Sequence, residues 1–436
     1  MKKISIGIIG FGTIGTGAIK LLLENGKLLS ERVGAEIRLK RIADVDIERS
    51  RGLQLDASLL TQDARDILTD PEIDIVVELM GGYEPARTFI LEAIDNGKHV
   101  VTANKALLAT HGDEIFLNAV RKGINIGFEA SVGGTIPIIK TLKESLIANR
   151  IQSMYAILNG TSNFILSKMT DEGKSFDVVL KEAQALGFAE ANPTYDIEGI
   201  DAAHKLAIML SLAYGKKVRL DEVYREGITG ITDQDIEFAK ELGYRIKLLA
   251  IAAQRDQRIE ARLHPTMIPF DHLLANVNSN FNAFHIIGDA ADSVFLYGQG
   301  AGMMPTASAV VGDIVDIARD MLKGISGRIP PRVRDEEHIE AISLLPFEEI
   351  RTNYYFRFSA VDCPGVLSRI AGILGANDIS IAAVIQKGRK QKGAVPVVMT
   401  TYKARECDVR KAMEDIDRLD VVMAKTVLIR IEDEHL

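Results

Sequence analysis

A glycine-rich turn near the start of the chain constrains the fold more than any other feature. Residues 4–9 form a short apolar run typical of a strand, and Gly10-Phe11-Gly12-Thr13-Ile14-Gly15 follows at once, before an apolar helical pattern that continues to about Leu23. In this setting the glycines let the backbone turn tightly and approach a pyrophosphate, which the free N–H groups of the helix N-terminus attract. The motif therefore predicts a dinucleotide-binding site at residues 10–15.

Alternating strand and helix patterns continue beyond this motif. Strands are predicted at about 36–45, 73–79, 98–102 and 124–128, and helices at about 84–96 and 111–122. Because parallel strands need helical crossovers, this alternation predicts an α/β fold with a doubly wound parallel sheet. We expect a Rossmann-type NAD(P)-binding domain over residues 1–130, to which a helix at 301–322 returns.

The second predicted strand carries the residues that bear on the choice of cofactor. It ends at Asp44, where an acidic side chain would bind the ribose hydroxyls of NAD. Four basic residues lie near it in the sequence, Lys40, Arg41, Arg49 and Arg51. Basic side chains favour the 2′-phosphate of NADP, so we expect NADP and keep NAD as the alternative.

A lysine follows the strand predicted at 98–102. The segment Val101-Thr102-Ala103-Asn104-Lys105 lies at the carboxyl edge of the expected sheet, where open α/β folds bind their ligands. Lys105 is therefore a candidate active-site residue. From its position alone, a solvated lysine at a strand end is an equally good interpretation.

An acidic loop leads into an apolar helix between Gly187 and Tyr214. Glu190, Asp196, Glu198 and Asp201 lie along the loop, and Lys205 is the one formally charged residue of the helix predicted at 202–214. Such a helix must pack most of its faces against protein. Asp201 and Lys205, at positions i and i+4, lie side by side. One interpretation of Asp201 and Lys205 is a solvated ion pair with no functional role. The apolar helix instead favours a pocket for a polar, partly cationic small molecule.

The rest of the chain divides into two further regions. After Thr135 the strand–helix alternation lapses, and residues 131–300 are expected to form a second domain, with a helix from Ile136 to near Asn149 and a turn at 159–163. Residues 324–350, with the charged run Arg332–Glu340, indicate a linker. Residues 351–432 then follow the pattern β-α-β-β-α-β of a small separate domain, with Pro364 expected in the first turn of its first helix.

Composition excludes several classes of protein. The net charge of -8 and the absence of a long Lys/Arg run argue against nucleic-acid and anionic-membrane partners. No stretch reaches the length of a membrane span, and the glycines interrupt the apolar start of the chain, which also lacks a signal-peptide cleavage pattern. The two cysteines, Cys363 and Cys407, provide no disulfide framework, so a cytoplasmic location is expected.

Four motifs taken together resemble homoserine dehydrogenase: G-F-G-T-I-G at 10–15, T-A-N-K at 102–105, N-G-T-S-N at 159–163, and G-F-A-E through D-A-A-H-K at 187–205. The tail, with D-C-P-G-V-L at 362–367, is similar to an ACT regulatory domain. The resemblance implies reversible, NAD(P)-dependent interconversion of L-aspartate 4-semialdehyde and L-homoserine, on the branch to threonine, isoleucine and methionine. It also implies that residues 131–300 are a substrate-binding and dimerisation domain of α+β type.

The resemblance assigns roles to individual positions. Lys205 matches the general acid/base and Lys105 the second active-site lysine. The positions that hold or support homoserine are Glu190, Asp196 and Asp201. The cofactor contacts are Gly10, Phe11, Gly12, Thr13, Ile14, Gly15, Asn104, Lys105, Gly187 and Gly302. A sodium-like monovalent cation would be held by Glu129, Val132, Gly134 and Ile136. Asn192 departs from the family, which commonly has aspartate there, and reduces the charge of the loop.

Two alternatives and one regulatory expectation remain. An aldehyde-oxidising dehydrogenase would need a cysteine nucleophile, and both cysteines lie in the C-terminal region. A cofactor-sensing regulatory protein without turnover would need no second polar pocket with a buried lysine. The ACT-like region implies feedback control, with threonine as the expected effector bound where two such domains pair. A homo-oligomer, either a dimer or a tetramer, is expected.

Overall fold

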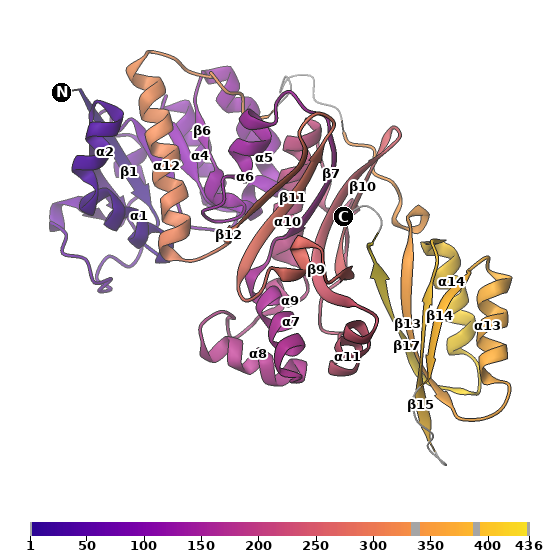
Figure 1. The fold of residues 1–436 in the computed structure, drawn as a ribbon. Coiled ribbons are helices and arrows are strands. Elements are labelled where there is room, and N and C mark those ends of the chain that lie inside the picture. The colour runs from indigo at the N-terminus through magenta and orange to yellow at the C-terminus, as the bar shows by residue number, and fades with distance from the viewer. Residues whose placement is uncertain (1, 333–340, 387–392, 434–436) are drawn as a thin grey trace. The chain divides into compact units, whose positions relative to one another are not determined.

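The computed structural model describes residues 2–332, 341–386 and 393–433 (Figure 1). Their internal contacts divide the chain into two compact units. Unit 1 comprises Met1–Gln152, Asp201–Glu222 and Asn282–Ile342, and unit 2 comprises Ser153–Ile200, Val223–Phe281 and Ser343–Leu436. No helix among the described residues is long and apolar enough to cross a membrane.

A parallel sheet forms the centre of unit 1. Within the described chain its six strands are β1 (Lys3–Ile9), β2 (Glu36–Ala43), β3 (Leu60–Thr61), β4 (Ile75–Glu78), β5 (His99–Thr102) and β6 (Ile126–Gly127), in the order β3-β2-β1-β4-β5-β6. Every neighbouring pair is parallel. The apolar residues of β1 and β4 are buried throughout, as expected for strands covered on both faces. The predicted α/β fold is confirmed; the short β3 was not predicted.

Helices cover the sheet of unit 1. They are α1 (Thr13–Glu24), α2 (Gly26–Val33), α3 (Arg65–Leu68), α4 (Ala86–Asp95), α5 (Lys105–Lys122) and α12 (Met303–Leu322). Figure 1 shows α12, in orange, running alongside α1, and a side chain at Gly17 would come within 2.8 Å of the Met303 carbonyl oxygen. The glycine therefore permits this close packing. Helix α5 begins at Lys105, six residues before its predicted start at 111, because Asn104 caps it by accepting a bond from the Leu107 N–H.

Among the remaining elements of unit 1, helix α10 agrees with the predictions and the others do not. The helix expected from Ile136 to Asn149 is limited to α6 (Ile138–Lys140) and a π-helical turn at Thr141–Ser145. Helix α10 (Ile200–Tyr214) is nearly all buried, as its apolar sequence predicts. Strands β11 (Phe281–Gly288) and β12 (Asp292–Gln299) are neighbours and were not predicted.

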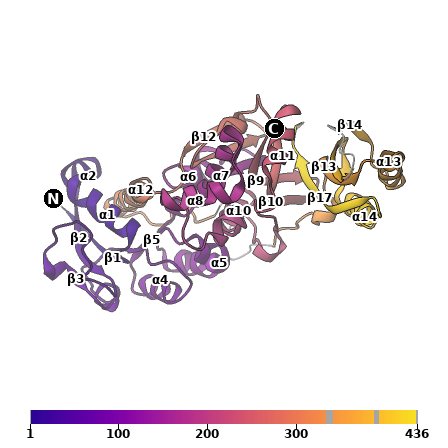
Figure 2. The same cartoon turned by 90° about the horizontal axis from the view of Figure 1, so that it is seen from below.

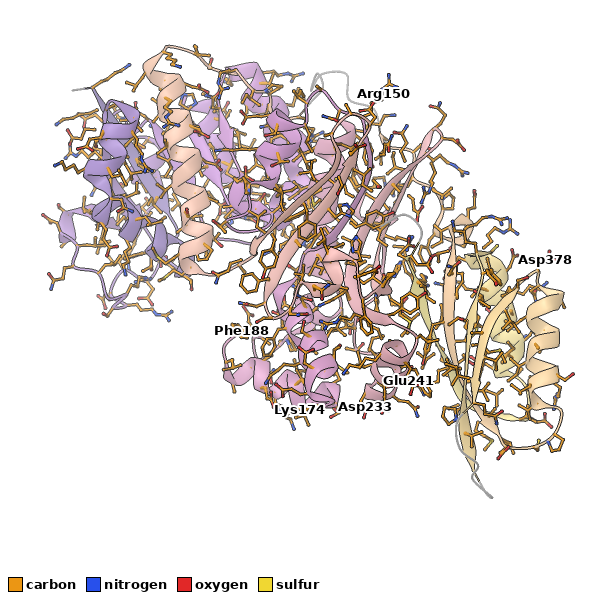
Figure 3. The ribbon with its side chains drawn as sticks, viewed as in Figure 1. Arg150, Lys174, Phe188, Asp233, Glu241 and Asp378 are labelled. Atoms are coloured by element: carbon orange, nitrogen blue, oxygen red, sulfur yellow. The ribbon has the colours of Figure 1, made fainter. Side chains whose placement is uncertain are left out.

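Unit 2 contains a sheet with the order β7-β9-β10-β17-β13-β15-β14. Its long central strands β9 (Tyr244–Arg255) and β10 (Arg258–Pro269) form an antiparallel hairpin, and β7 (Ile151–Ile157) pairs with β9. The helices of this part are α7 (Gly160–Glu172), α8 (Phe176–Ala185), α9 (Thr194–Ile197) and α11 (Asp233–Glu241), and the short strand β8 (Tyr224–Arg225) pairs with β10. In Figure 3, Asp233 and Glu241 mark the two ends of α11.

The C-terminal part of unit 2 has the predicted β-α-β-β-α-β order. It consists of β13 (Arg351–Val361), α13 (Val366–Ala376), β14 (Ile381–Gln386), β15 (Ala394–Thr401), the short β16 (Ala404–Arg405), α14 (Glu406–Asp417) and β17 (Val422–Ile431). Both helices lie on one side of the strands in Figures 1 and 2, and share one apolar core with them. Pro364 lies before α13 and not in its first turn, because Gly365, with φ +92°, is the N-cap. Of the predicted linker at 324–350, residues 333–340 lie outside the described residues.

One buried aspartate joins the C-terminal part to the rest of unit 2. The Asp235 carboxylate accepts bonds from the backbone N–H and hydroxyl of Thr232, at 3.2 and 2.6 Å, and completes the capping box of α11. The same carboxylate accepts from the Arg357 guanidinium of β13, at 2.6 and 2.9 Å. The βαββαβ segment is therefore fastened to the helix end by charge-assisted bonds.

A buried lysine, Lys247 of β9, is surrounded by neutral acceptors. Its Nζ donates to the Asn163 amide oxygen, the Ser167 hydroxyl and the Val277 carbonyl, at 3.1, 3.3 and 2.6 Å, and the residue is 1% exposed. Burial, with repulsion from Arg245, lowers the pKa of Lys247 from 10.5 to about 7.

This pKa predicts a pH-dependent stability. Between the two values the unfolded chain binds a proton at Lys247 that the folded chain does not, so the free energy of unfolding should rise with pH across that window. Urea unfolding at about pH 7 and about pH 9 should show a larger gain for the native sequence than for Lys247→Met. Lys27→Met, at an exposed lysine, is the matched control. An equal gain in all three proteins would contradict the prediction.

Candidate active site

The glycine-rich turn has the backbone shape that a dinucleotide needs. Gly10 has φ +106°, and a side chain there would lie 2.7 Å from the Leu79 backbone. A side chain at Gly15 would lie 2.1 Å from the Gly10 carbonyl oxygen, so both positions require glycine. Gly12 is the N-cap of α1 and offers no side-chain acceptor, which leaves the N–H groups of Thr13 and Ile14 at an open helix start.

Asp44 and Arg51 hold this turn in place. The Asp44 carboxylate accepts a 2.6 Å bond from the Phe11 N–H, and Arg51 pairs with Asp44 at 3.3 Å while stacking 4.4 Å from the Phe11 ring. Arg51 also donates to the Phe11 carbonyl. Asp44 and Arg51 thus have structural partners beside the position expected for the ribose.

The other basic neighbours of Asp44 differ in their contacts. Lys40 pairs with Asp70 and Glu72, and Arg41 donates to the Ser58 carbonyl. Arg49 is exposed, and its backbone carbonyl accepts from Arg51. Arg51 therefore contacts the turn directly, and Arg49 is linked to it through the bond from Arg51 to the Arg49 backbone carbonyl.

Two predicted lysines share one carboxylate. Asp201, in the first turn of α10, accepts from Lys205 Nζ at 2.7 Å through one oxygen and pairs with Lys105 Nζ at 3.1 Å through the other. The side chains of Asp201 and Lys205 are each 9% exposed, whereas that of Lys105 is 41% exposed. The structure therefore brings Lys105, Asp201 and Lys205 together. It excludes a solvated ion pair for Asp201 and Lys205.

A buried glutamate that the sequence analysis missed organises the loops next to Lys105. Glu78 ends β4 with no exposed surface and accepts from the Met80 N–H and the Thr102 hydroxyl, at 2.8 and 2.7 Å. Burial raises its pKa. Asn104 adds a 2.7 Å bond to the Gly82 carbonyl. The sequence signal that could have identified Glu78 is its position as an acidic residue at the end of an otherwise apolar strand, Ile75–Glu78.

The acidic loop of unit 2 is held by the 159–163 turn. Asn159 donates to the Asp196 carboxylate at 2.7 Å, and the Ser162 hydroxyl donates to the Asp196 carbonyl at 2.9 Å. Thr161 donates to the carbonyl of Phe188, which Figure 3 labels. This turn begins α7, with Asn159 as N-cap. The N-G-T-S-N motif therefore both starts a helix and fixes the predicted substrate loop.

The other predicted residues of this loop differ from Asp196 in their exposure and in their contacts. Gly187 has φ +75°, a conformation that favours glycine, and follows Leu186, the C-cap of α8. Glu190 is exposed, and its backbone carbonyl accepts from Gln184 at 3.1 Å. Its carboxylate is thus at the surface of unit 2, whereas that of Asp196 is engaged by protein.

The four residues predicted to hold a cation lie close together in the sequence and are buried. Val132, Gly134 and Ile136 are buried, and the Glu129 carboxylate accepts from the Ile139 and Lys140 N–H groups at 2.8 and 3.0 Å. Among the described residues, no three His, Cys, Asp or Glu side chains gather as metal ligands. A cation here would depend on backbone carbonyls and one carboxylate, which are hard oxygen donors of the kind that sodium accepts.

Two distant residues complete this region of unit 1. The Glu129 N–H donates to the Asp313 carboxylate of α12 at 2.8 Å. Burial, with mutual repulsion, raises the pKa of Glu129 to about 7, and burial raises that of Asp313 to about 6. Gly302, with φ +124°, is the N-cap of the same helix. No sequence signal linked Asp313 to Glu129, because they lie far apart along the chain.

Comparisons with known proteins identify the family to which the chain is similar. The family models "Homoserine dehydrogenase, NAD binding domain", "Homoserine dehydrogenase" and "ACT domain" match residues 10–129, 137–315 and 354–421. Homoserine dehydrogenase of Pseudomonas aeruginosa is 46% identical, with 99% of both chains covered, and that of Neisseria gonorrhoeae is 45% identical, with 100% of both covered.

Solved structures give the same result. A homoserine dehydrogenase from Thiobacillus denitrificans is 48% identical, with a TM-score of 0.94 and 99% of each chain covered. A hyperthermophilic archaeal homoserine dehydrogenase in complex with NADPH is 28% identical, with a TM-score of 0.63, and covers 75% of this chain and 100% of its own. The chain with the dinucleotide turn and the paired lysines therefore belongs to the homoserine dehydrogenase family.

Proposed function

We propose that Lys205 donates and removes the proton in the reversible interconversion of L-aspartate 4-semialdehyde and L-homoserine. The observation that carries this proposal is the Asp201 carboxylate, which holds the ammonium groups of Lys205 and Lys105 at 2.7 and 3.1 Å. A carboxylate that is 9% exposed and bonded to two lysines keeps both cationic heads in fixed positions. A bound reduced nicotinamide cofactor would supply the hydride for aldehyde reduction, and its oxidised form would accept the hydride in the reverse direction.

The two lysines can stabilise the negative charge that develops on the substrate oxygen during hydride transfer. When hydride reaches an aldehyde carbon, the oxygen becomes negative and needs a proton. Lys205 gives that proton during reduction and takes it back during oxidation. Lys105, which is more exposed, adds a second positive charge for the same oxygen and for the nicotinamide end of the cofactor. Asp201 acts by orienting both lysines and by balancing their repulsion.

Two acids of unit 2 are proposed to serve the amino-acid end of the substrate. The exposed Glu190 carboxylate has the charge that an ammonium group requires. Asp196 is bonded to Asn159 at 2.7 Å, which supports a role in holding the loop. Because both Asp201 oxygens already hold lysines, Glu190 is the stronger candidate for direct contact with the substrate ammonium.

The cofactor proposal favours NADP. The nucleotide turn at residues 10–15 would hold the pyrophosphate at the start of α1, and Asn104, Lys105, Gly187 and Gly302 remain proposed contacts. Arg51 pairs with Asp44, and the exposed Arg49 is joined to Arg51 through its backbone carbonyl; a 2′-phosphate near Asp44 would add two negative charges. Arg51 has structural partners, so Arg49 is proposed as the residue that distinguishes NADP from NAD.

Several further features belong to the same proposal. Threonine is proposed as the feedback effector of the ACT part, and the active assembly as a homo-oligomer in the cytoplasm. Sodium is proposed at Glu129, Val132, Gly134 and Ile136, where it would stabilise the backbone. A cofactor sensor is disfavoured by the buried Lys205–Asp201 pair, and the free cysteines Cys363 and Cys407 lie in the ACT part.

Replacing Lys205 by methionine tests the central proposal. Lys205→Met keeps the length of the side chain but has no proton to transfer, so kcat should fall about 10²- to 10⁴-fold. The Kd for NADPH should stay near the native value. Steady-state oxidation of homoserine, followed by absorbance of the reduced nicotinamide, measures the first quantity. Lys181→Met, at an exposed lysine of α8, is the control. A near-native kcat for Lys205→Met would leave Lys205 as a structural residue.

Replacing Glu190 by glutamine tests substrate binding. Removal of its charge should raise the KM for homoserine about 10-fold with little change in kcat, because a charge-assisted bond to the ammonium is lost in ground state and transition state alike. Glu237→Gln, at an exposed position of α11, is the matched control. An unchanged KM would remove Glu190 from the substrate pocket.

A pair of arginine variants tests the cofactor proposal. Arg49→Ala should raise the KM for NADP about 10-fold and leave that for NAD unchanged, because only NADP carries the 2′-phosphate. Arg51→Ala should raise both values, since Arg51 holds the turn that binds either cofactor. The assay is homoserine oxidation with each cofactor in parallel. Equal effects of Arg49→Ala on both cofactors would exclude a phosphate contact at that residue.

A further inference from the structure

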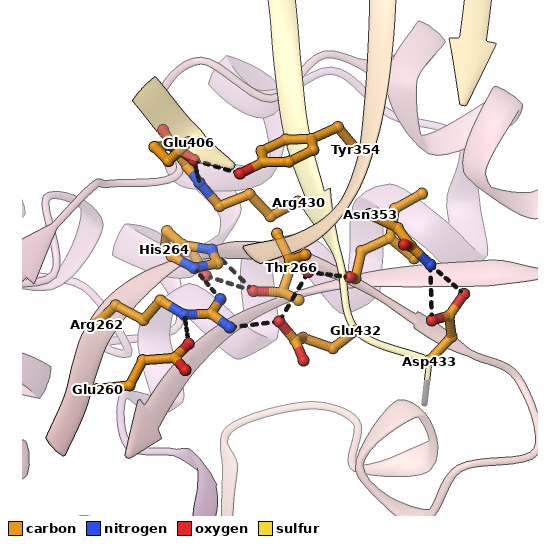
Figure 4. Close-up of polar contacts among 12 residues, drawn as sticks. Glu260, Arg262, His264, Thr266, Asn353, Tyr354, Glu406, Arg430, Glu432 and Asp433 are labelled. Atoms are coloured by element: carbon orange, nitrogen blue, oxygen red, sulfur yellow. Dashed lines mark hydrogen bonds and ion pairs between the residues drawn. The ribbon is translucent and has the colours of Figure 1, made fainter. Parts of the chain in front are cut away.

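The buried carboxylate of Glu78 differs from other buried acids of the chain in its partners. Figure 4 shows Glu260 bonded to Arg262 and Glu406 bonded to Arg430, at 2.6 and 2.9 Å, so that a buried cation balances each of these acids. Glu78 has no exposed surface, and every partner that the described residues give it is a neutral donor. A buried carboxylate without a cation is unfavourable, so its bonds to the neighbouring loops must offset that penalty.

One oxygen of Glu78 holds the turn that follows β4. Its Oε1 accepts from the N–H groups of Met80 and Gly81, at 2.8 and 3.3 Å. Gly81 and Gly82 have φ +77° and +73°, which gives this turn a left-handed backbone that favours glycine. The turn lies against the dinucleotide motif, because a side chain at Gly10 would come within 2.9 Å of the Met80 backbone nitrogen. Glu78 therefore fixes a segment that is in contact with the proposed cofactor site.

The other oxygen of Glu78 leads to Lys105 through two side chains. Its Oε2 accepts from the Thr102 hydroxyl at 2.7 Å, and the oxygen of that hydroxyl accepts from the Asn104 N–H at 3.0 Å. Asn104 is the N-cap of α5, and Lys105 is the first residue of that helix. These bonds determine where α5 begins, and they therefore determine the backbone position from which the Lys105 side chain extends.

The Lys105 side chain depends on this backbone more than Lys205 does. Lys105 is 41% exposed, and its Nζ lies 3.1 Å from the Asp201 carboxylate, whereas the side chain of Lys205 is 9% exposed. A half-exposed lysine is fixed by fewer packing contacts than a buried one, so it keeps more rotamer freedom. A shift of about 1 Å in a group that contacts the reacting atoms can lower the rate about 100-fold.

We propose that Glu78 is a positioning residue for hydride transfer, which orients Lys105 through Thr102 and orients the cofactor through the turn at Met80 and Gly81. With no exposed surface, Glu78 acts through these groups and not by contact with the substrate. The inference rests on the proposed role of Lys105 in the active site. It predicts that the bond to Thr102 affects kcat, and that the bonds to the turn affect the binding of the cofactor.

Replacing Thr102 by valine tests the connection to Lys105. Thr102→Val has nearly the same shape but lacks the hydroxyl that bonds to Glu78. The kcat of homoserine oxidation by the full-length protein should fall about 10-fold, with the KM for homoserine within about 2-fold of native. Thr102→Ser keeps the hydroxyl and should restore kcat to within about 3-fold of native. Thr426→Val is the matched control, because Thr426 is also buried and donates to the Asp417 carboxylate at 2.6 Å.

A double-mutant cycle distinguishes the positioning of Lys105 from a general loss of stability. Lys105→Met alone should lower kcat at least about 10-fold. In the Lys105→Met protein, Thr102→Val should lower kcat by less than about 2-fold further, because the group that Thr102 positions is already absent. An equal fold-loss in both backgrounds would overturn the inference, as would a native kcat for Thr102→Val. A native kcat for Lys105→Met would instead refute the proposed role of Lys105, and the inference with it.

Replacing Glu78 by methionine tests the connection to the cofactor. Glu78→Met keeps the length of the side chain and removes both acceptor oxygens, so the N–H groups of Met80 and Gly81 lose their partner. The Kd for NADPH, measured by fluorescence titration, should rise about 5-fold or more. Thr102→Val leaves the acceptor of this turn in place and should bind NADPH within about 2-fold of native. A native Kd for folded Glu78→Met would overturn the assignment of this carboxylate to the cofactor turn.

Discussion

The shared carboxylate of Asp201 is the interaction on which the proposed active site depends. Two lysines from different helices approach within hydrogen-bonding distance of one buried acid. Without it, two ammonium groups in one pocket would repel each other and lose their fixed positions. The position of Asp201 in the first turn of α10 adds the helix dipole to its stabilisation. The buried helix α10 therefore carries Asp201 and Lys205 together and holds Lys105 beside them.

The sequence predicted the local features of the fold and missed the long-range ones. Gly10 and Gly15 are required by contacts within the turn itself, so their spacing could be read directly. Lys205 stood out because its neighbours on α10 are apolar. The hairpin β9–β10 was missed. The apolar run 248–253 of β9 has no alternation to distinguish it from a buried helix, whereas β10 alternates polar and apolar residues, a strand signal that the sequence analysis did not use. Residues such as Asp313 and Glu78 act through partners that only the fold brings near.

The same contrast applies to the candidate site. From the sequence alone, a solvated lysine was an equally good interpretation of Lys105. Its contact with Asp201 in the structure favours an active-site role. The sequence placed four carboxylates along the acidic loop, and the structure distinguishes them by their partners. Asp196 is bonded to Asn159, Glu198 to Thr229, and Asp201 to two lysines, whereas Glu190 is exposed. Partners of this kind depend on tertiary packing and cannot be read from spacing.

The C-terminal part is less independent of the rest of unit 2 than its βαββαβ order suggests, because it is bonded to the capping box of α11. Asp235 completes the N-terminus of that helix with the same carboxylate that holds Arg357 of β13. Removal of the C-terminal segment would leave this acid without its cation, with only the capping bonds to Thr232 remaining. The two parts of unit 2 should therefore melt in one cooperative transition, and the C-terminal segment contributes to the stability of the whole unit.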